Sequence, residues 1–244
     1  MTRHILILGG TSEARQLANH AAKAGWSAVF SLAGVTATPL KTALPVRVGG
    51  FGGVKGLAEW IDANAITHLV DTTHPYAGKM SANAYEAARL TGIKRLALWR
   101  PEWRAEEGDN WHQFSTMEAL FQAIPAAAHL FLAAGQEGIR ALPHPPRFRV
   151  TARALEQPNT AHPITFIKAL PASDPDVEAA LFSANAITHL AVKNAGGTAS
   201  RAKLIAARKL GLPVFMLARP APPPPPLFTT LDALIAALSD ADHC

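Results

Sequence analysis

The sequence Ala-Asn-Ala-Ile-Thr-His-Leu occurs twice in this chain, at 63–69 and again at 184–190. The copies lie 121 residues apart in a chain of 244, which is close to half its length. An identical heptad at this spacing indicates that the two halves share one structural plan. Because one match in an alanine-rich chain also arises by chance, the interpretation depends on further matches in the same order.

Three further segments of the first half have counterparts in the second. They are 4–10 with 129–135, 92–101 with 211–220, and 115–120 with 229–234. Four collinear matches predict two similar domains, over residues 1–125 and 126–244. Two domains of separate origin but similar α/β pattern would predict the same architecture.

In both halves, short apolar runs alternate with segments of helical length. In the first half, strands are expected near 5–8, 28–32, 46–48, 68–71 and 96–99, with helices over 12–24, 54–63 and 77–90. In the second half, strands are expected near 130–133, 148–151, 165–168, 190–193 and 214–217, with helices over 176–184 and 199–210. The alternation predicts an α/β fold of two Rossmann-like domains with parallel sheets.

The end of each half carries a helix-start signal. Ser115 with Glu118, and Thr229 with Asp232, have the spacing of a capping box that opens a final helix. The run 222–226 is all proline, which excludes helix and central strand, so we expect a rigid extended arm before the last helix.

Composition narrows the functional classes. The chain is 49% hydrophobic and 17% charged, which is sufficient for a packed core. No apolar run is long enough to span a bilayer, and the start of the chain passes directly into a strand-like run, so we expect a cytoplasmic protein without a signal peptide or membrane contact. The single cysteine, Cys244, excludes an internal disulfide framework and a cysteine metal cluster, and it suits a reducing compartment.

The net charge of +5 comes without a basic run. Nucleic-acid binding would usually show clustered cations with interleaved aromatic residues, and this chain shows neither. A small anionic partner fits better, such as a phosphate-bearing cofactor or a polycarboxylate substrate. Solubility alone is the alternative explanation of the charge.

The first expected strand is followed by Gly9 and Gly10, and a helix is expected to start near Ser12. Glycines allow a tight turn and close approach of a ligand, and the N–H groups at a helix start bind phosphate. The turn lacks the full G-x-G-x-x-G pattern, although Ala14 occupies a later small-residue position. A simple connection between strand and helix is the alternative.

The second expected strand ends at 31–34 without the carboxylate that binds the ribose diol of NAD, which favours NADPH. The nearest downstream charges are Lys41 and Arg47. The second half has 134–137 (Ala-Gly-Gln-Glu) at its first turn, which is a poorer phosphate site. We therefore expect only the N-terminal domain to hold the nucleotide, and a substrate cleft between the domains.

After the shared strand the halves diverge. The first half continues with Asp71 and the cluster 72–77, which gathers polar and aromatic groups at a strand end, and its Pro75 suits the first turn of the next helix. Capping of that helix by Asp71 or Thr73 is the alternative. The second half continues with 193–203, a glycine turn flanked by cations that forms a candidate carboxylate clamp, with a turn bearing solvated cations as the alternative. No metal-ligand spacing is present.

Six motifs appear together in one order: 9–15, 31–34, 49–53, 71–77, 193–197 and 219–220. With these motifs the chain resembles the precorrin-6A reductase family of cobalamin biosynthesis, from residue 4 to about residue 220. Three departures bear on substrate contacts. Ala195 stands where the family often has serine, and Gly135-Gln136 stands where Gly-Arg-Gln is frequent. The segment 169–171 (Ala-Leu-Pro) stands where Gly-Pro-Phe is common.

The resemblance implies transfer of a hydride from NADPH to a ring double bond of precorrin-6A, an anionic tetrapyrrole, with a proton added beside it. The implied cofactor-binding residues are Gly9, Gly10, Thr11, Ser12, Glu13, Arg15, Ser31, Ala33, Gly34, Thr72 and Thr73. The expected catalytic residues are His74 and Tyr76, either of which would supply the proton, with solvent as the alternative donor. The implied substrate-binding residues are Pro75, Gly135, Gln136, Lys193, Asn194, Gly196, Gly197 and Lys203.

Two other classes remain open at this stage. A two-domain glycosyltransferase would share the twin Rossmann-like architecture, and binding of a UDP-sugar would reveal it. A non-catalytic nucleotide sensor would bind the cofactor without oxidising it. We expect a monomer or a weak homo-oligomer, because no heptad pattern or exposed apolar stripe demands a partner.

Overall fold

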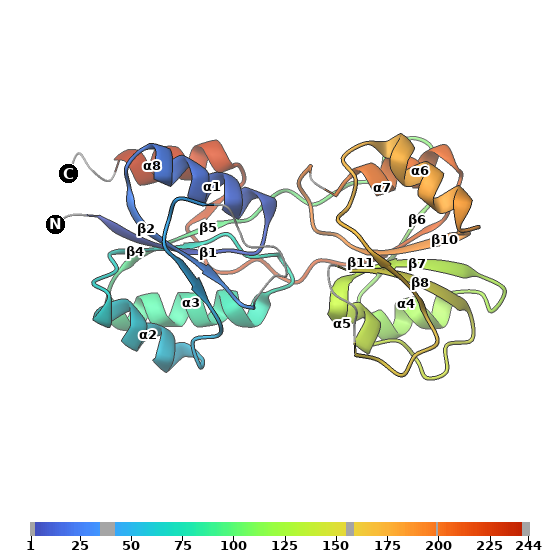
Figure 1. Ribbon diagram of the computed structural model, residues 1–244, viewed down its shortest axis with the longest axis horizontal. Coiled ribbons are helices and arrows are strands. Elements are labelled where there is room, and N and C mark those ends of the chain that lie inside the picture. The colour runs from blue at the N-terminus through green and yellow to red at the C-terminus, as the bar shows by residue number, and fades with distance from the viewer. Residues whose placement is uncertain (1–2, 35–41, 155–158, 199, 241–244) are drawn as a thin grey trace. The chain divides into compact units, whose positions relative to one another are not determined.

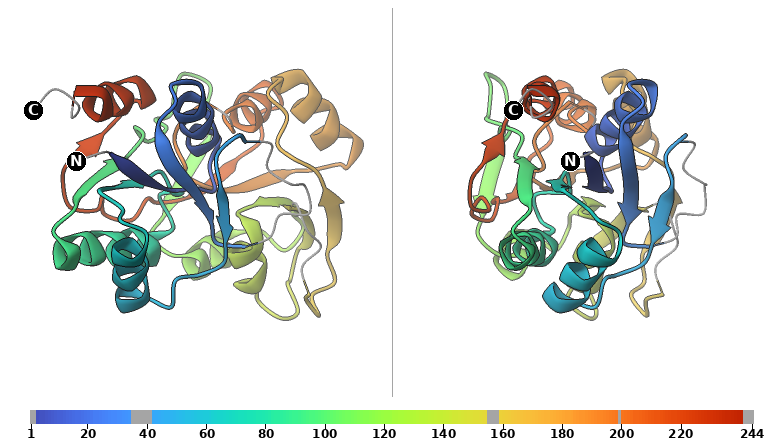
Figure 2. Two further views of the ribbon diagram at one scale, coloured as in Figure 1. Left: turned by 60° about the vertical axis from the view of Figure 1, so that its left-hand side comes forward. Right: turned by 90° about the vertical axis from the view of Figure 1, so that its left-hand side faces the viewer.

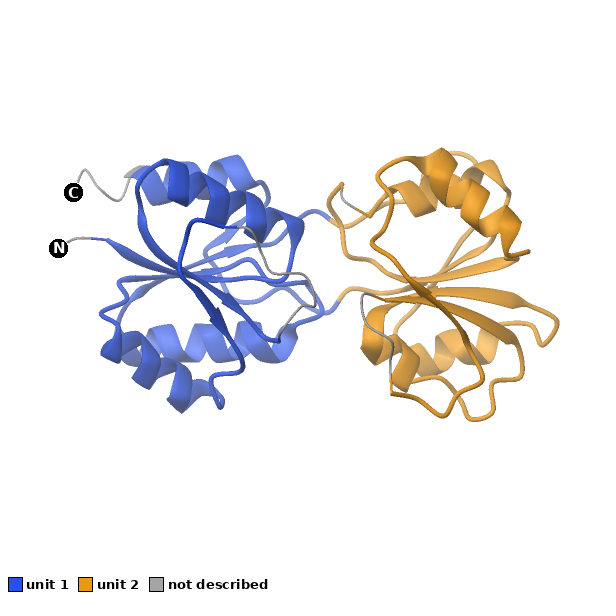
Figure 3. Cartoon of the chain, viewed as in Figure 1, with its two compact units in different colours: residues 1–101, 220–244 blue, residues 102–219 orange. Residues whose placement is uncertain are grey.

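The computed structural model describes residues 3–34, 42–154, 159–198 and 200–240. The chain forms two compact units (Figure 3). Unit 1 consists of residues 1–101 and 220–244, and unit 2 consists of residues 102–219. Each unit contains one six-stranded sheet, and all the strand pairs in both sheets are parallel. Cys244 and Lys41 lie outside the described residues.

Unit 1 has the strand order β12-β5-β4-β1-β2-β3. Its strands are β1 (His4–Leu8), β2 (Ser27–Leu32), β3 (Val46–Val48), β4 (His68–Asp71), β5 (Lys94–Leu98) and β12 (Leu227–Phe228). Its helices are α1 (Ser12–Lys23), α2 (Val54–Ala63), α3 (Gly78–Thr91) and α8 (Leu231–Asp240). Helices α1 and α8 cover one face of the sheet, and α2 and α3 cover the other (Figure 1).

Unit 2 has the equivalent strand order β6-β11-β10-β7-β8-β9. Its strands are β6 (Trp111–Phe114), β7 (His129–Ala133), β8 (Arg149–Ala154), β9 (Thr165–Lys168), β10 (His189–Lys193) and β11 (Val214–Leu217). Its helices are α4 (Met117–Ala123), α5 (Gly135–Arg140), α6 (Pro175–Ala184) and α7 (Ala202–Lys209). Helices α4 and α5 lie on one face, and α6 and α7 on the other (Figure 1).

The repeated heptad adopts the same structure in both units. In unit 1, Thr67 Oγ1 accepts a hydrogen bond from the His4 N–H at 2.9 Å. In unit 2, Thr188 Oγ1 accepts the corresponding bond from the His129 N–H at 2.9 Å. The alanine two residues before each threonine has φ 49°, a left-handed conformation that is uncommon for residues other than glycine. The sequence repeat is therefore a repeat of structure.

The predicted boundary at residue 125 is wrong, because the units exchange their last strand and helix. Strand β6 pairs with β11 in unit 2, and α4 packs there too. Strand β12 pairs with β5 in unit 1, and α8 contacts α1 (Figure 2). Both exchanged strands lie at sheet edges, where the partner is set by long-range packing that sequence periodicity does not report.

Both faces of the unit 1 sheet are buried, as expected for a parallel sheet with helices on each side. Ile5 and Ile7 of β1 lie in the core beneath α1 and α8. Leu6 and Leu8 of the same strand point to the opposite face and pack against α2 and α3. This packing fixes the ends of the strands, from which the loops of the candidate site emerge.

Three local predictions need correction. The final helices are capped one residue later than predicted. Thr116 accepts from the Ala119 N–H at 3.1 Å, and Thr230 accepts from the Ala233 N–H at 3.2 Å. Pro75 lies before α3 rather than in its first turn, because the chain makes a turn there and the helix begins at Gly78 with Ala77 as its N-cap.

Candidate functional site

The carboxyl end of β1 leads into a turn in which two adjacent glycines are needed for different reasons. A Cβ on Gly9 would lie 2.4 Å from Cζ of Phe30, so only glycine fits against that ring. Gly10 has φ +118°, which side chains rarely tolerate, and a Cβ there would meet nothing within 4 Å. The turn is therefore tightly packed against Phe30 at Gly9 and has open space beside Gly10.

Thr11 joins this turn to the end of β4. Its Oγ1 caps α1 by accepting from the Ala14 N–H at 3.0 Å and donates to the Thr72 carbonyl at 2.8 Å. In return, Thr72 Oγ1 donates to the Leu8 carbonyl at 2.7 Å. Strands β1 and β4 are neighbours whose following connections run to opposite sides of the sheet, which is the topological switch point where α/β folds bind ligands. The two threonines fix the backbone there.

Asp71 supports the end of β4 from within. It is 3% exposed, and its Oδ1 accepts from both the N–H and the hydroxyl of Thr73, at 3.1 and 2.7 Å. Arg95 on β5 lies 3.8 Å from the other carboxylate oxygen. Burial lowers the pKa of Arg95, and the charge of Asp71 opposes this shift. Neither Asp71 nor Thr73 caps α3, whose N-cap is Ala77, so the predicted capping alternative is wrong.

His74 and Tyr76 follow as half-buried side chains, whereas Pro75 between them is buried. The rings of His74 and Tyr76 have centroids 5.5 Å apart. His74 Nδ1 accepts from the Tyr76 N–H at 3.3 Å, which places the proton of a neutral imidazole on Nε2. The two side chains thus present one titratable ring and one phenol next to the switch point.

The far side of the turn is formed by the ends of β2 and β3. Ser31 is 4% exposed, and its carbonyl accepts from the Gly9 N–H at 2.8 Å. Ala33 and Gly34 follow as exposed positions without a carboxylate. On β3, Arg47 donates to the Gly50 carbonyl at 2.8 Å and lies 3.6 Å from the Phe51 ring centroid. Arg47 therefore holds the glycine-rich segment 49–53 beside the end of β2.

Glu13 and Arg100 form an ion pair at the first turn of α1. Arg100 Nη1 donates to Glu13 Oε2 at 2.7 Å, and the same oxygen accepts from the Ser12 hydroxyl at 2.8 Å. Burial acts to raise the pKa of Glu13, but the hydrogen bond and charge of Arg100 outweigh it, so the pKa lies below its usual value. Arg15, two residues further along α1, is exposed.

The equivalent edge of unit 2 carries a different set of groups. Lys193 at the end of β10 pairs with Glu137 of α5 at 2.5 Å. Asn194 is buried and forms two hydrogen bonds with the backbone of Trp103, at 2.8 and 3.0 Å. The indole of Trp103 donates to the Gly197 carbonyl at 2.7 Å. This edge offers a cation beside a glycine turn that a buried tryptophan holds in place.

Lys203 has different surroundings from Lys193. It is 4% exposed, its Nζ donates to the Ser200 carbonyl at 2.6 Å, and it lies 5.1 Å from the Trp103 ring centroid. Burial lowers the pKa of Lys203 to about 7, with nearby Arg153 adding to the shift and Glu178 opposing it. Lys203 therefore contacts the turn from the interior of unit 2 and is not on its surface.

The profile of the family described as Precorrin-6x reductase CbiJ/CobK matches residues 4–239. A precorrin-6A reductase of Rhodobacter capsulatus is 42% identical over 246 residues, which cover 98% of this chain and 97% of that protein. A cobalt-precorrin-6A reductase of Priestia megaterium is 26% identical over 251 residues, covering 96% of this chain and 97% of its own. The chain belongs to the precorrin-6x reductase family.

A solved structure gives the same result for the fold. The protein described as CobK precorrin-6A reductase superposes with a TM-score of 0.90 at 40% sequence identity, covering 98% of this chain and 97% of that one. This confirms the predicted α/β fold with two parallel sheets. A reductase family implies a nucleotide cofactor, and the family resemblance read from the sequence is confirmed.

The structure brings most of the predicted cofactor residues of this reductase together. The segments 9–13, 31–34 and 72–73 all lie at the carboxyl edge of the unit 1 sheet, linked by the hydrogen bonds described above. Sequence reasoning missed Arg100, which reaches Glu13 from a position 87 residues away. The echo of Arg100-Pro101 in Arg219-Pro220 was the only signal for it.

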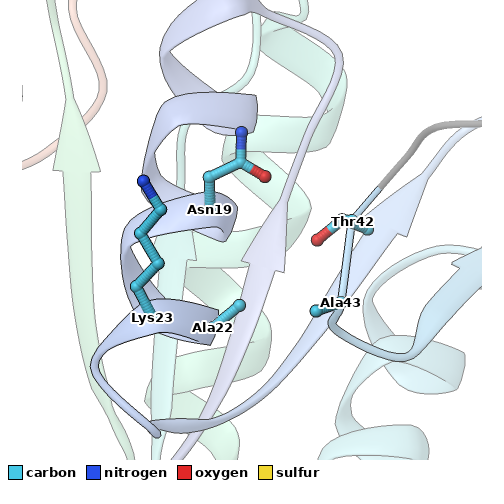
Figure 4. Close-up of a pocket in the computed structure, with 5 residues that line it drawn as sticks. All are labelled: Asn19, Ala22, Lys23, Thr42 and Ala43. Carbon is cyan, nitrogen blue, oxygen red and sulfur yellow. The ribbon is translucent and has the colours of Figure 1, made fainter.

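Other kinds of site are not supported among the described residues. No group of three or more His, Cys, Asp or Glu side chains there is arranged to hold a metal ion. None of the helices within the described ranges has the length and apolar character needed to cross a membrane. A hollow of about 410 Å³ lies near the opposite end of α1 from the glycine turn (Figure 4). Its lining of Asn19, Ala22, Lys23, Thr42 and Ala43 contains none of the predicted site residues.

Proposed function

We propose that this chain reduces a ring double bond of precorrin-6A by transferring a hydride from NADPH, in cobalamin biosynthesis. The observation that carries the proposal is the turn at Gly9, Gly10 and Thr11, locked to the end of β4 at the switch point of a sheet in a reductase family. The net reaction adds one hydride and one proton across a C=C bond and releases NADP⁺.

The turn fits the diphosphate of a dinucleotide. The open space above Gly10 admits a ligand close to the backbone, and α1 is a twelve-residue helix whose first turn faces that space. Gly9, Gly10, Thr11, Ser12, Glu13 and Arg15 would fix the diphosphate and the adjacent ribose. When bound, the reduced nicotinamide supplies the hydride.

The end of β2 favours NADPH over NADH. Ser31, Ala33 and Gly34 would face the phosphorylated ribose, and a carboxylate that would repel its phosphate is absent from these positions. Arg47 on the neighbouring strand adds a positive charge on this side of the turn. The same segment in a protein specific for NADH would carry an acidic residue.

The end of β4 would place the reacting groups. Thr72 and Thr73 would orient the nicotinamide, and His74 or Tyr76 would donate the proton that completes the reduction. His74 is suited to this role because its Nδ1 is held by the Tyr76 N–H, which directs the Nε2 proton outward from that contact. Positioning of the hydride donor against the ring supplies the rest of the catalysis.

Unit 2 would bind the substrate carboxylates. We propose Lys193 as the principal cation, with Asn194, Gly196 and Gly197 shaping the turn and Gly135 and Gln136 bordering it. Pro75 and Lys203 would contribute from buried positions, Lys203 through Trp103. The metal-free precorrin is the proposed substrate, because the relative named for it is 42% identical and the relative named for the cobalt form is 26% identical. We place the reaction in the cytoplasm, in a monomer or weak homo-oligomer.

Titration with NADPH and with NADH, followed by the fluorescence of the reduced nicotinamide, tests the proposal. We expect tight binding of NADPH, weaker binding of NADH, and oxidation of NADPH only when precorrin-6A is added. Binding of neither nucleotide would refute the proposal. Binding of a UDP-sugar in their place would favour a glycosyltransferase, and binding without turnover would favour a nucleotide sensor.

A further inference from the structure

Arg100 reaches across the switch point of the unit 1 sheet. It follows β5, whereas its partner Glu13 lies in the first turn of α1, directly after β1. In the sheet, β4 separates β5 from β1, so the two strands are roughly 10 Å apart. The Arg100 side chain therefore extends past the end of β4 to reach the glycine turn.

The pair is buried and oriented. The side chains of Arg100 and Glu13 are 11% and 13% exposed, and Glu13 Oε2 is fixed by both Arg100 and the Ser12 hydroxyl. Removing two charges from water costs about as much as their attraction returns, so a buried ion pair is weak evidence for a stabilising role. The lowered pKa of Glu13 keeps the carboxylate ionised at neutral pH. The ion pair therefore fixes the position of the Arg100 guanidinium beside the first turn of α1.

The corresponding positions of unit 2 carry different side chains and contacts among the described residues. Its corresponding arginine, Arg219, follows β11 and donates through Nε to the Asn194 carbonyl at 3.2 Å. The position that corresponds to Glu13 is Gly138, in the short helix α5. At these corresponding positions, the pairing of an arginine with the glutamate of the first helical turn is therefore described for unit 1, for which we propose nucleotide binding.

We propose that Arg100 binds the diphosphate of the dinucleotide cofactor, and that Glu13 is the positioning residue that anchors its guanidinium beside the turn. The inference rests on the proposed function. A guanidinium is a planar fork of five donors, so a carboxylate can hold it through one nitrogen while others bind phosphate oxygens. An unpaired Glu13 would repel the diphosphate, and Arg100 cancels that charge as well.

The test compares three glutamine variants, R100Q, E13Q and R89Q, by NADPH titration over a series of salt concentrations. We expect R100Q to weaken NADPH binding by about 30-fold and to flatten its salt dependence, because a charge-assisted contact to phosphate is lost. We expect E13Q to weaken binding by about threefold to tenfold, less than R100Q, because the cation remains but loses the carboxylate that positions it. R89Q removes an exposed ion pair with Glu86 and should change nothing.

Several outcomes would overturn the inference. Equal losses of NADPH affinity in R100Q and E13Q would show that the ion pair is only structural. A raised KM for precorrin-6A with an unchanged NADPH Kd would assign Arg100 to substrate carboxylates. If R100Q does not fold, R100K replaces it, and binding as tight as in the wild type would refute the need for the planar fork. Failure of the wild-type protein to bind NADPH would instead refute the proposed function.

Discussion

The two units share a topology but differ at the carboxyl edges of their sheets. At the amino edges, Thr67 and Thr188 form the same bond to the start of β1 and of β7, respectively. At the carboxyl edges, unit 1 has a capped twelve-residue helix after a double-glycine turn, whereas α5 of unit 2 has six residues and no side-chain cap. The hydrogen bond at the amino edges is shared by the two units, whereas the turn and helix at the carboxyl edges differ. This difference agrees with our proposal that the edge of unit 1 binds phosphate and the edge of unit 2 binds carboxylates.

The largest expected effect comes from placing the same side chain in the two turns. We expect G10E to weaken NADPH binding by at least about 100-fold, because a carboxylate at φ +118° strains the turn and occupies the phosphate space. The matched variant G135E should leave the NADPH Kd unchanged and raise the KM for precorrin-6A. Fluorescence titration and steady-state kinetics measure both. Similar losses of NADPH affinity in the two variants would contradict the assignment of roles.

Lys193 tests whether unit 2 binds the substrate and unit 1 binds the nucleotide. We expect K193Q to raise the KM for precorrin-6A by about tenfold with little change in NADPH Kd, because one charge contact to a carboxylate is lost. Its ion-pair partner supplies the control, since E137Q removes a competing carboxylate and should lower the KM or leave it unchanged. A K193Q variant with altered NADPH affinity and normal KM would place the nucleotide in unit 2.

The lowered pKa of Lys203 in unit 2 predicts that the free energy of unfolding depends on pH. Its pKa is lowered from 10.5 to about 7, mainly by burial, so between these values the unfolded chain holds a proton that the folded chain lacks. Stability should therefore rise with pH across this window, and K203M should lose that rise. Denaturant unfolding from pH 7 to pH 10 measures it. If the free energy of unfolding changed with pH in the same way in the wild-type protein and in K203M, the Lys203 ammonium would be hydrated and its pKa would not be lowered.

The smallest expected effect tests what the units have kept in common. T67V and T188V each remove a hydroxyl that accepts a hydrogen bond from a strand N–H and also contacts the following histidine ring, and each should cost about 1–2 kcal/mol of unfolding free energy. Neither variant should alter the NADPH Kd or the KM for precorrin-6A. Thermal unfolding and the same titrations provide the measurements, and a selective loss of binding in T67V would extend the candidate site to the amino edge.

The alternation of strands and helices could be predicted from the sequence because it depends on local periodicity. The strands at 46–48, 68–71, 165–168 and 214–217 have the predicted bounds. The exchange of β6 and β12 could not be predicted, since β12 has two residues and β6 has exposed polar positions, which gives neither a core-strand pattern. The cap positions also shifted by one residue because adjacent hydroxyl residues, such as Ser115 and Thr116, compete for the same role.

The candidate site shows the same division. The glycine turn and the cluster 72–76 are each a short continuous segment of the sequence. The residue types within each segment were therefore enough to predict a phosphate turn and a group of polar and aromatic side chains. The partnership of Arg100 with Glu13 depends on the order of strands in the sheet, and the burial of Lys203 depends on packing against Trp103. Spacing in the sequence reports neither kind of contact.

The number of NADPH molecules bound per chain tests the central claim most directly. Isothermal titration calorimetry of the wild-type protein should give one site per chain, and the heat of binding should vanish in G10E. Two sites per chain, or one site that survives in G10E and is lost in G135E, would contradict the division of roles between the two units.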